Sequence, residues 1–216
     1  MIGASGGIGA AMAAEAERRG AAVERMARSE GGPDLTDEAA VAAAMGALEP
    51  PFDAVVVAVG ALAPAREAPE KRIAEVTAEG LAAAFAVNAL GPMLALKHAL
   101  PLLPKDRRFV FAALSARVGS IGDNAVGGWH SYRASKAALN QLVHGAAVEL
   151  SRTHKEGAAI LLHPGTVATP FTADYAGRHR TIPPEEAARR LWDVIEGAGP
   201  AMSGGFFDNG GARIPW

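Results

Sequence analysis

Short apolar runs alternate with longer segments of helical periodicity along most of the chain. Residues 52–60 (FDAVVVAVG) form a β-branched run typical of a parallel strand that helices cover on both faces. Residues 107–115 and 157–167 have the same character. Strands that alternate with helices in this way build βαβ units, whose crossovers are right-handed. The pattern therefore predicts an α/β fold with a doubly wound parallel sheet.

Local signals place the remaining elements. A first helix is expected from Ile8 to the stop signal at Gly20, and residues 21–29 (AAVERMARS) read as a strand. Thr36 is the expected N-cap of a second helix, because acidic residues follow it in the first turn. Further helices are expected around Asn88, over residues 131–153 and over residues 183–197, and a last short strand within residues 204–211.

The glycine-rich stretch MIGASGGIG opens the chain without the strand that usually precedes such a turn. Only Met1 and Ile2 stand before Gly3, so the first strand is expected to be largely missing. A central strand has partners on both sides, and its loss leaves buried backbone donors and acceptors unpaired. We therefore expect either that Met1 is an internal methionine of a longer natural sequence or that the fragment is poorly stable.

Composition narrows the class of protein. The 216 residues suffice for one core, and no repeat or linker divides them, so residues 1–216 are expected to form a single domain. The net charge of -2 argues against nucleic acid or an anionic membrane as a partner. The lack of cysteine fits a reducing compartment, and a cytoplasmic location is expected. Residues 81–96 are apolar but shorter than the ~18 residues a membrane span needs, so we expect a buried helix.

The glycine-rich turn is the first candidate for chemistry. Its glycine spacing lets the backbone approach a phosphate while the following helix points its N-terminus at that phosphate. The same spacing also arises wherever a strand and a helix pack closely, so the turn alone is weak evidence. The residues of the turn expected to contact a dinucleotide are Gly3, Ser5, Gly7, Ile8 and Gly9.

A second candidate is the pair Tyr132 and Lys136 in YRASK, which lie one helical turn apart on the same face. A tyrosine with an ordinary pKa near ~10 needs a shift of about 3 units, or about 4 kcal/mol, to act near neutral pH. A lysine ammonium ~5 Å away supplies about 3 kcal/mol at an effective dielectric constant of ~20. Such a pair is suited to proton transfer, although the spacing also occurs by chance.

Five segments are stronger evidence together than each is alone. They are the glycine-rich turn, VNALG at 87–91, LSARVGS at 114–120, YRASK at 132–136 and HPGTVAT at 163–169. In this order they resemble the short-chain dehydrogenase/reductase family over essentially the whole chain, and most closely its C-factor-like and sniffer-like branch. The resemblance implies a Rossmann-type fold and hydride transfer between a nicotinamide cofactor and a small carbonyl or alcohol substrate.

The resemblance also implies roles for individual residues. Tyr132 is expected to donate or accept the proton, Lys136 to lower the pKa of Tyr132 and hold the ribose, and Asn88 to support a proton relay. Asp34 is expected on the adenine side, and Thr169 beside the nicotinamide amide. Besides the turn, the expected cofactor-binding residues are Arg28, Asp34, Gly60, Tyr132, Lys136, Val167 and Thr169.

The chain departs from the family pattern at three places, one of which is the usual NNAG, replaced here by VAVG ending at Gly60. The usual Ser-Ser pair after the strand reads Ser115-Ala116. Either Ser115 fills the catalytic role, which we favour, or Ser120 fills it, or the enzyme works without full help at the carbonyl oxygen. The segment between Arg28 and Asp34 is too short for the family's third strand, which is expected to be short or absent.

The cofactor can be predicted from the end of the second strand, where an acidic residue would hold the ribose of NAD. Here Ala27 and Arg28 occupy that region, so NADP is expected, with Arg28 as the phosphate clamp. NAD stays open, since Arg28 is otherwise an ordinary solvated arginine.

The leading hypothesis is an NADP(H)-dependent oxidoreductase with Tyr132 as acid and base. The alternative is a nucleotide-binding regulatory or signalling protein of the same fold with little catalytic activity, a reading that Ala116 motivates. No metal site is predicted from the histidine spacing. Residues 176–180 (AGRHR) are expected to be a solvated loop, and the apolar residues 81–100 leave a homo-oligomer open.

Overall fold

The computed structural model describes residues 1–172 and 181–216 and confirms the α/β class. Its strands are β1 (Ala54–Val57), β2 (Val110–Leu114), β3 (Ala158–His163) and β4 (Phe206–Asp208). Its α-helices are α1 (Gly7–Arg18), α2 (Glu38–Gly46), α3 (Ala78–Phe85), α4 (Gly91–Ala99), α5 (His130–Thr153) and α6 (Pro184–Gly197). Short 3₁₀ helices cover Arg28–Glu30, Ile73–Glu75, Leu100–Leu102, Arg117–Gly119 and Pro200–Met202.

The four strands are parallel and follow the order β1-β2-β3-β4. The missing first strand is reduced to Ile2, which bridges Val57 on one side and Met26 on the other. Its amide donates to the carbonyl of Val56 at 2.9 Å, and its carbonyl accepts from the amide of Ala58 at 2.8 Å. On the other side, the amide of Met26 donates to the carbonyl of Met1 at 2.9 Å and the amide of Gly3 donates to the carbonyl of Met26 at 2.8 Å, so this short remnant is paired on both sides.

The prediction of a strand over residues 21–29 was wrong in extent. Only Met26 pairs there, and a 3₁₀ turn begins at Arg28. The physical reason is the length of its partner, because a one-residue remnant at Ile2 offers no ladder to extend along. Consistent with the expectation for a third strand, the structure places no strand between Arg28 and Asp34.

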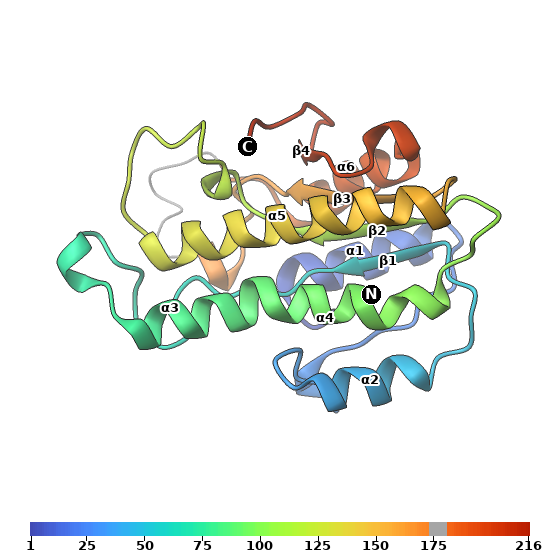
Figure 1. The fold of residues 1–216 in the computed structure, drawn as a ribbon, viewed down its shortest axis with the longest axis horizontal. Helices are drawn as coiled ribbons and strands as arrows, with labels where there is room; N and C mark the ends of the chain where they lie inside the picture. The colour runs from blue at the N-terminus through green and yellow to red at the C-terminus, as the bar shows by residue number, and fades with distance from the viewer. Residues whose placement is uncertain (173–180) are drawn as a thin grey trace.

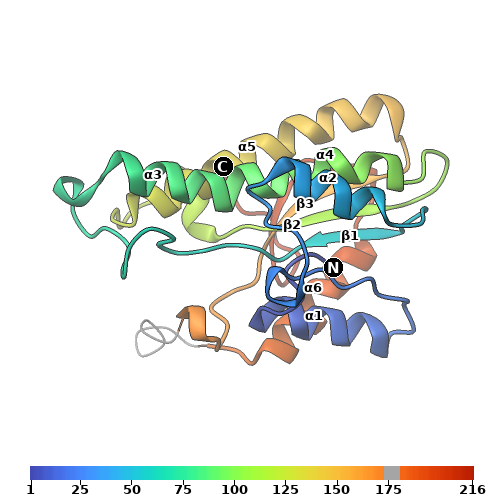
Figure 2. The ribbon, with the colours of Figure 1, turned by 90° about the horizontal axis from the view of Figure 1, so that it is seen from below.

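Helices cover both faces of the sheet, as Figures 1 and 2 show. Helices α2 to α5 lie on one face, and α1 and α6 pack together on the other. Alternate residues of β1 point to opposite faces, so Val55 and Val57 join the core under α4 and α5, whereas Val56 joins the core under α1 and α6. The β-branched run thus fills two cores, as the sequence predicts.

The apolar helix around Asn88 is interrupted by a π-helical turn, Ala86–Leu90, between α3 and α4. The helical stretch Ala78–Leu102 is long and apolar enough to cross a membrane by length and composition alone, and its most apolar 18-residue window has a mean hydropathy of 1.4. Half of its most apolar window is buried inside the fold, where α3 contacts α5 and α4 contacts α2 and β1. This packing agrees with the predicted buried helix.

One cap differs from the sequence prediction. Helix α2 is capped by Asp37, whose carboxylate accepts from the amides of Ala39 and Ala40, so the prediction of Thr36 was wrong. Thr36 instead donates to Asp34 through its amide and its hydroxyl.

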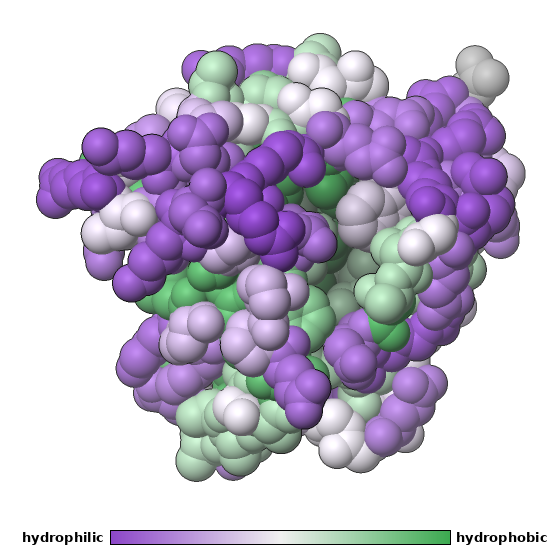
Figure 3. Space-filling view, turned by 90° about the vertical axis from the view of Figure 1, so that its right-hand side faces the viewer, coloured by the Kyte–Doolittle hydropathy of each residue, from purple (hydrophilic) through white to green (hydrophobic). Residues whose placement is uncertain are grey.

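Figure 3 views the end of the molecule where the strands begin, and hydrophilic side chains dominate its rim. The site described below lies at the opposite end, where the strands finish.

Candidate active site

A cavity of about 410 Å³ lies where β1, β2 and β3 end, beside the N-terminus of α1. Parallel strands of a doubly wound sheet bind ligands at this edge. Of the predicted site residues, the structure brings together Ser5, Gly7, Ile8, Gly9, Gly60, Ser115, Tyr132, Lys136, Val167 and Thr169 in the cavity lining. Gly3, Arg28, Asp34 and Asn88 are outside that lining.

The glycine-rich turn is shaped so that side chains do not fit. Gly3 has φ +85, and a Cβ there would lie 2.7 Å from the carbonyl oxygen of Ala58. A Cβ on Gly9 would collide with the carbonyl oxygen of Gly3, and one on Gly7 would lie 2.8 Å from the methyl group of Thr169. The first turn of α1 therefore presents bare backbone to the cavity, which suits a phosphate group.

Tyr132 and Lys136 stand on the first turns of α5, and both side chains are buried, with exposures of 6% and 3%. The Lys136 Nζ lies 5.9 Å from the centre of the Tyr132 ring and donates to the carbonyl oxygen of Leu114 at 2.9 Å. Burial raises the pKa of Tyr132 above its ordinary value and lowers the pKa of Lys136 to about 8.

The expected lowering of the Tyr132 pKa by Lys136 is therefore not seen in the protein alone. Burial is the cause of the raised Tyr132 pKa, because taking the phenolate out of water disfavours the charged form, and burial likewise disfavours the ammonium of Lys136. The consequence is a neutral, proton-bearing Tyr132 hydroxyl near neutral pH. Such a group is a proton donor, the role that reduction of a carbonyl requires.

Asn88 lies in the π-helical turn and is fully buried. Its carboxamide pairs with the backbone of Ala61, accepting from the amide at 2.9 Å and donating to the carbonyl at 2.8 Å. It also donates to the Ser135 hydroxyl at 3.1 Å, and that hydroxyl donates to the carbonyl of Tyr132 at 2.8 Å. Asn88 thus joins the segment after β1 to the helix that carries Tyr132.

Ser115 lines the cavity at the end of β2, and its hydroxyl donates to the side-chain oxygen of Asn140 at 2.6 Å. Asn140 is in turn held by the carbonyl of Gly119 at 3.4 Å. Ser120 is buried, accepts from the amide of Asp123 and is not part of the lining. Of the two serines, the geometry favours Ser115 for contact with a bound substrate.

Arg28 and Asp34 lie together at the far side of the glycine-rich turn, joined by an ion pair of 3.1 Å. Hydrogen bonds from Thr36 are the main cause that holds the pKa of Asp34 below its usual value, and Arg28 adds to the effect. Arg28 is 77% exposed, and next to it the Ser29 hydroxyl donates to the hydroxyl of Ser5 at 2.8 Å. This corner is linked to the turn through Ser29 and Ser5.

Sequence reasoning missed three residues of the site. Asn140 orients Ser115 from 25 positions along the chain, and no local pattern indicates it. Phe171 lines the cavity with its ring 6.2 Å from that of Tyr132. His163 also lines it, and burial lowers its pKa to about 4, so it is neutral at physiological pH.

Two further expectations concern other groups. Within residues 1–172 and 181–216, no cluster of three or more His, Cys, Asp and Glu side chains forms a metal site. The AGRHR segment at residues 176–180 lies outside the described residues.

A parallel sheet, a bare-backbone turn at its carboxyl edge and a buried Tyr-Lys pair in one cavity define the class of Rossmann-type α/β oxidoreductases. Residues 3–191 match the family profile described as enoyl-(acyl carrier protein) reductase. The chain belongs to the short-chain dehydrogenase/reductase family. That assignment confirms the resemblance inferred from the sequence motifs.

Two curated relatives are similar over part of the chain. A 1-hydroxy-2-glutathionyl-2-methyl-3-butene dehydrogenase of Rhodococcus sp. is 40% identical over 131 residues, which cover 60% of this chain and 56% of the relative. The C-signal protein of Myxococcus xanthus is 39% identical over 137 residues, covering 63% and 78%. The chain thus spans little more than half the length of the Rhodococcus protein.

Solved structures match over the whole chain. One of them is described as a short-chain dehydrogenase/reductase from Burkholderia multivorans with bound NADP. It has a TM-score of 0.86 at 29% identity, and the match covers 100% of this chain and 97% of that one. The carbonyl reductase Sniffer of Drosophila melanogaster has a TM-score of 0.82 at 20% identity, over the same shares, which shows a common fold. The C-signal likeness supports the C-factor-like part of the branch predicted from the sequence.

Proposed function

We propose that this protein is an NADP(H)-dependent carbonyl reductase or alcohol dehydrogenase in which Tyr132 transfers the proton. The observation that carries the proposal is the placement of a neutral, buried Tyr132 beside Lys136 in the same cavity as the glycine-rich turn. A proton donor and a dinucleotide cradle that share one cavity are the two parts that carbonyl reduction needs.

The residues present fit a nicotinamide dinucleotide. The turn packs too closely for a Cβ at Gly3 or Gly9, which would collide with the carbonyl oxygen of Ala58 or of Gly3, so bare backbone amides at the start of α1 are available to a pyrophosphate. In this proposal Lys136 would hold the ribose and Thr169 the carboxamide. When bound, the cofactor supplies or accepts the hydride.

The chain's own side chains manage the proton and the developing charge. Tyr132 donates its hydroxyl proton to the carbonyl oxygen during reduction, and Lys136 stabilises the phenolate that remains. The Ser115 hydroxyl donates its one proton to Asn140 in the protein alone and would turn from that bond to donate to the same oxygen when substrate binds; loss of such a donor costs about 3 kcal/mol in other enzymes. The hydrogen bonds from Asn88 through Ser135 to the carbonyl of Tyr132 hold this arrangement together.

The test of this proposal is NADPH consumption by the purified protein with a panel of aldehydes, ketones and quinones, followed at the absorbance of the reduced cofactor. We expect turnover with at least one member of the panel. NADPH binding without any turnover would instead favour the alternative, a regulatory or signalling protein of the same fold. The similarity to the C-signal protein is the observation that supports this alternative.

We further propose that NADP is preferred over NAD and that Arg28 contributes to the preference. Arg28 is exposed at the end of the Ile2–Met26 bridge region, and two solved relatives at 29% and 27% identity are described with NADP. Arg28→Gln is expected to raise the KM for NADPH roughly tenfold or more, because a charge-assisted contact to a phosphate is lost. The KM for NADH should stay unchanged, and a wild-type preference for NADH would contradict the assignment.

The remaining expectations are proposals of the same kind. A cytoplasmic location and a small carbonyl or alcohol substrate fit an oxidoreductase of this family, and neither nucleic acid nor a membrane is proposed as a partner. Exposed apolar side chains on the layer of α3 to α5 support a homo-oligomer, namely Phe85, Leu90, Leu142 and Val148.

A further inference from the structure

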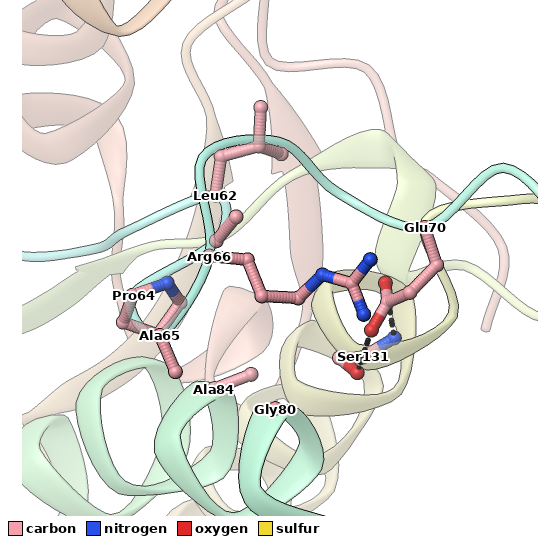
Figure 4. Close-up of a pocket in the computed structure, with 9 residues that line it drawn as sticks. Leu62, Pro64, Ala65, Arg66, Glu70, Gly80, Ala84 and Ser131 are labelled. Atoms are coloured by element: carbon pink, nitrogen blue, oxygen red, sulfur yellow. Dashed lines mark hydrogen bonds between the residues drawn. The ribbon is translucent and has the colours of Figure 1, made fainter. Parts of the chain in front are cut away.

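A buried carboxylate outside the cavity contacts the helix that carries Tyr132. Glu70 is only 2% exposed and lies in the long connection between β1 and α3. Its carboxylate accepts from the hydroxyl and from the amide of Ser131, the latter at 3.3 Å. Figure 4 shows this carboxylate directed at Ser131, with the Arg66 side chain extending toward the same group.

The start of α5 needs such a partner. Its N-cap residue, Trp129, has φ 52 and ψ 41, a left-handed conformation that a bulky residue adopts only when its surroundings hold it there. The Trp129 side chain provides no cap for the helix. The amide of Trp129 donates to the carbonyl of Glu70, and Arg133 donates to the carbonyl of Gly128 at 2.9 Å.

Glu70 therefore supplies the cap from 61 positions earlier in the chain. A carboxylate that accepts a hydrogen bond from an amide of the first helical turn pairs a donor that has no partner within the helix. Its negative charge also interacts favourably with the positive end of the helix dipole. Hydrogen bonds from Ser131 hold the pKa of Glu70 below its usual value against the opposing effect of burial, so the group is ionised at neutral pH.

The same connection is fixed to the site at its other end. It begins after Gly60. The side chain of Asn88 accepts a hydrogen bond from the amide of Ala61 and donates one to its carbonyl. The connection is thus anchored to the cofactor cavity by Asn88 and to the first turn of α5 by Glu70. Tyr132 directly follows Ser131, so any release of that turn changes where the phenol points.

We propose that Glu70 is a positioning residue that fixes the first turn of α5 and thereby the direction in which Tyr132 enters the cavity. The proposal rests on the proposed function, since it assigns Glu70 a part in the proton transfer by Tyr132. Glu70 itself is not among the residues that line the cavity.

The test compares Glu70→Ala, Glu70→Gln and Ser131→Ala with Glu79→Gln, an exposed carboxylate in the first turn of α3, as the matched control. Glu70→Ala is expected to lower kcat roughly 10- to 100-fold, as small displacements of catalytic groups do, while the KM for NADPH is unchanged. Glu70→Gln keeps an acceptor for the Ser131 amide and should recover most of the activity. The double variant Glu70→Ala/Ser131→Ala should be little worse than Glu70→Ala, since the two act as one unit.

Amide hydrogen exchange gives a readout that does not depend on activity. Glu70→Ala should speed exchange in residues 130–136 and leave residues 139–150 protected. A wild-type kcat in Glu70→Ala, unchanged exchange in residues 130–136, or a parallel loss of kcat, NADPH affinity and exchange protection throughout α5 would overturn the proposal. Absence of turnover in the wild type would refute the proposed function, and the exchange measurement would still decide whether Glu70 positions the helix.

Discussion

Burial works against the charged forms of both Tyr132 and Lys136, and this has a measurable effect on stability. The pKa of Lys136 in the folded protein is about 8, below its ordinary value of 10.5. Between these two pH values the unfolded chain binds a proton that the folded protein has lost, so stability rises with pH across this window. Below pH 8 the full cost of the buried ammonium is present.

We therefore predict a specific pH dependence. Between pH 7 and pH 9.5 the free energy of unfolding of the wild type should gain on the order of 2 kcal/mol relative to Lys136→Met, which lacks the titrating group. Urea unfolding followed by tryptophan fluorescence measures this difference. Lys155→Met, at an exposed lysine, is the control and should follow the wild type. Parallel curves for the wild type and Lys136→Met would show that Lys136 is not desolvated.

Some residues of the site could be predicted because neighbours in the sequence carry the signal. Tyr132 and Lys136 share a helical face, and the glycines of the turn are adjacent in the chain. Asn140 and Glu70 carry no such signal, because each acts on a residue 25 or 61 positions away. Long-range hydrogen bonds of this kind depend on the fold and cannot be read from local spacing.

At the scale of elements, the glycine-rich turn packs so closely that several of its positions have no room for a side chain. A Cβ on Gly9 would collide with the carbonyl of Gly3, a backbone atom that cannot move away without disturbing the turn. A Cβ on Gly6 would lie 3.5 Å from the same oxygen, which is an ordinary contact. Gly6 is therefore a matched control for a substitution at Gly9.

We predict that Gly9→Ala destabilises the protein by roughly 1–3 kcal/mol or more, the usual cost of overpacking. Gly6→Ala, with an unstrained φ of -73, should melt close to the wild-type temperature. Thermal unfolding by circular dichroism compares the two variants. A Gly9→Ala protein as stable as Gly6→Ala would mean that the turn is looser than described.

The helices were predicted well and the first strands less well, for a physical reason. Helices α5 and α6 begin within a residue of the predicted positions, since their apolar periodicity is local. The strand predicted at residues 21–29 depends on a partner that Ile2 supplies only at one point. The π-helical turn at Asn88 adds one residue to a helical turn, which the apolar pattern does not reveal.

At the scale of the whole molecule, one helical layer presents apolar side chains to the outside. Leu90 is 47% exposed and Val148 is 49% exposed, on neighbouring helices of the layer formed by α3, α4 and α5. We predict that light scattering after size exclusion gives more than one chain per particle, because burying such surface favours association. Leu90→Glu with Val148→Glu should shift the particle toward one chain. A monomeric wild type at micromolar concentration would contradict this.

The most direct test of the central claim is the kcat of Tyr132→Phe with NADPH and the best carbonyl substrate, measured beside the Kd for NADPH. The variant removes one hydroxyl and keeps the ring packed against Trp129 and Phe171. We predict a loss of about 10²-fold or more in kcat, as expected for a missing general acid, with the Kd for NADPH unchanged. Turnover by Tyr132→Phe at the wild-type rate would contradict the account.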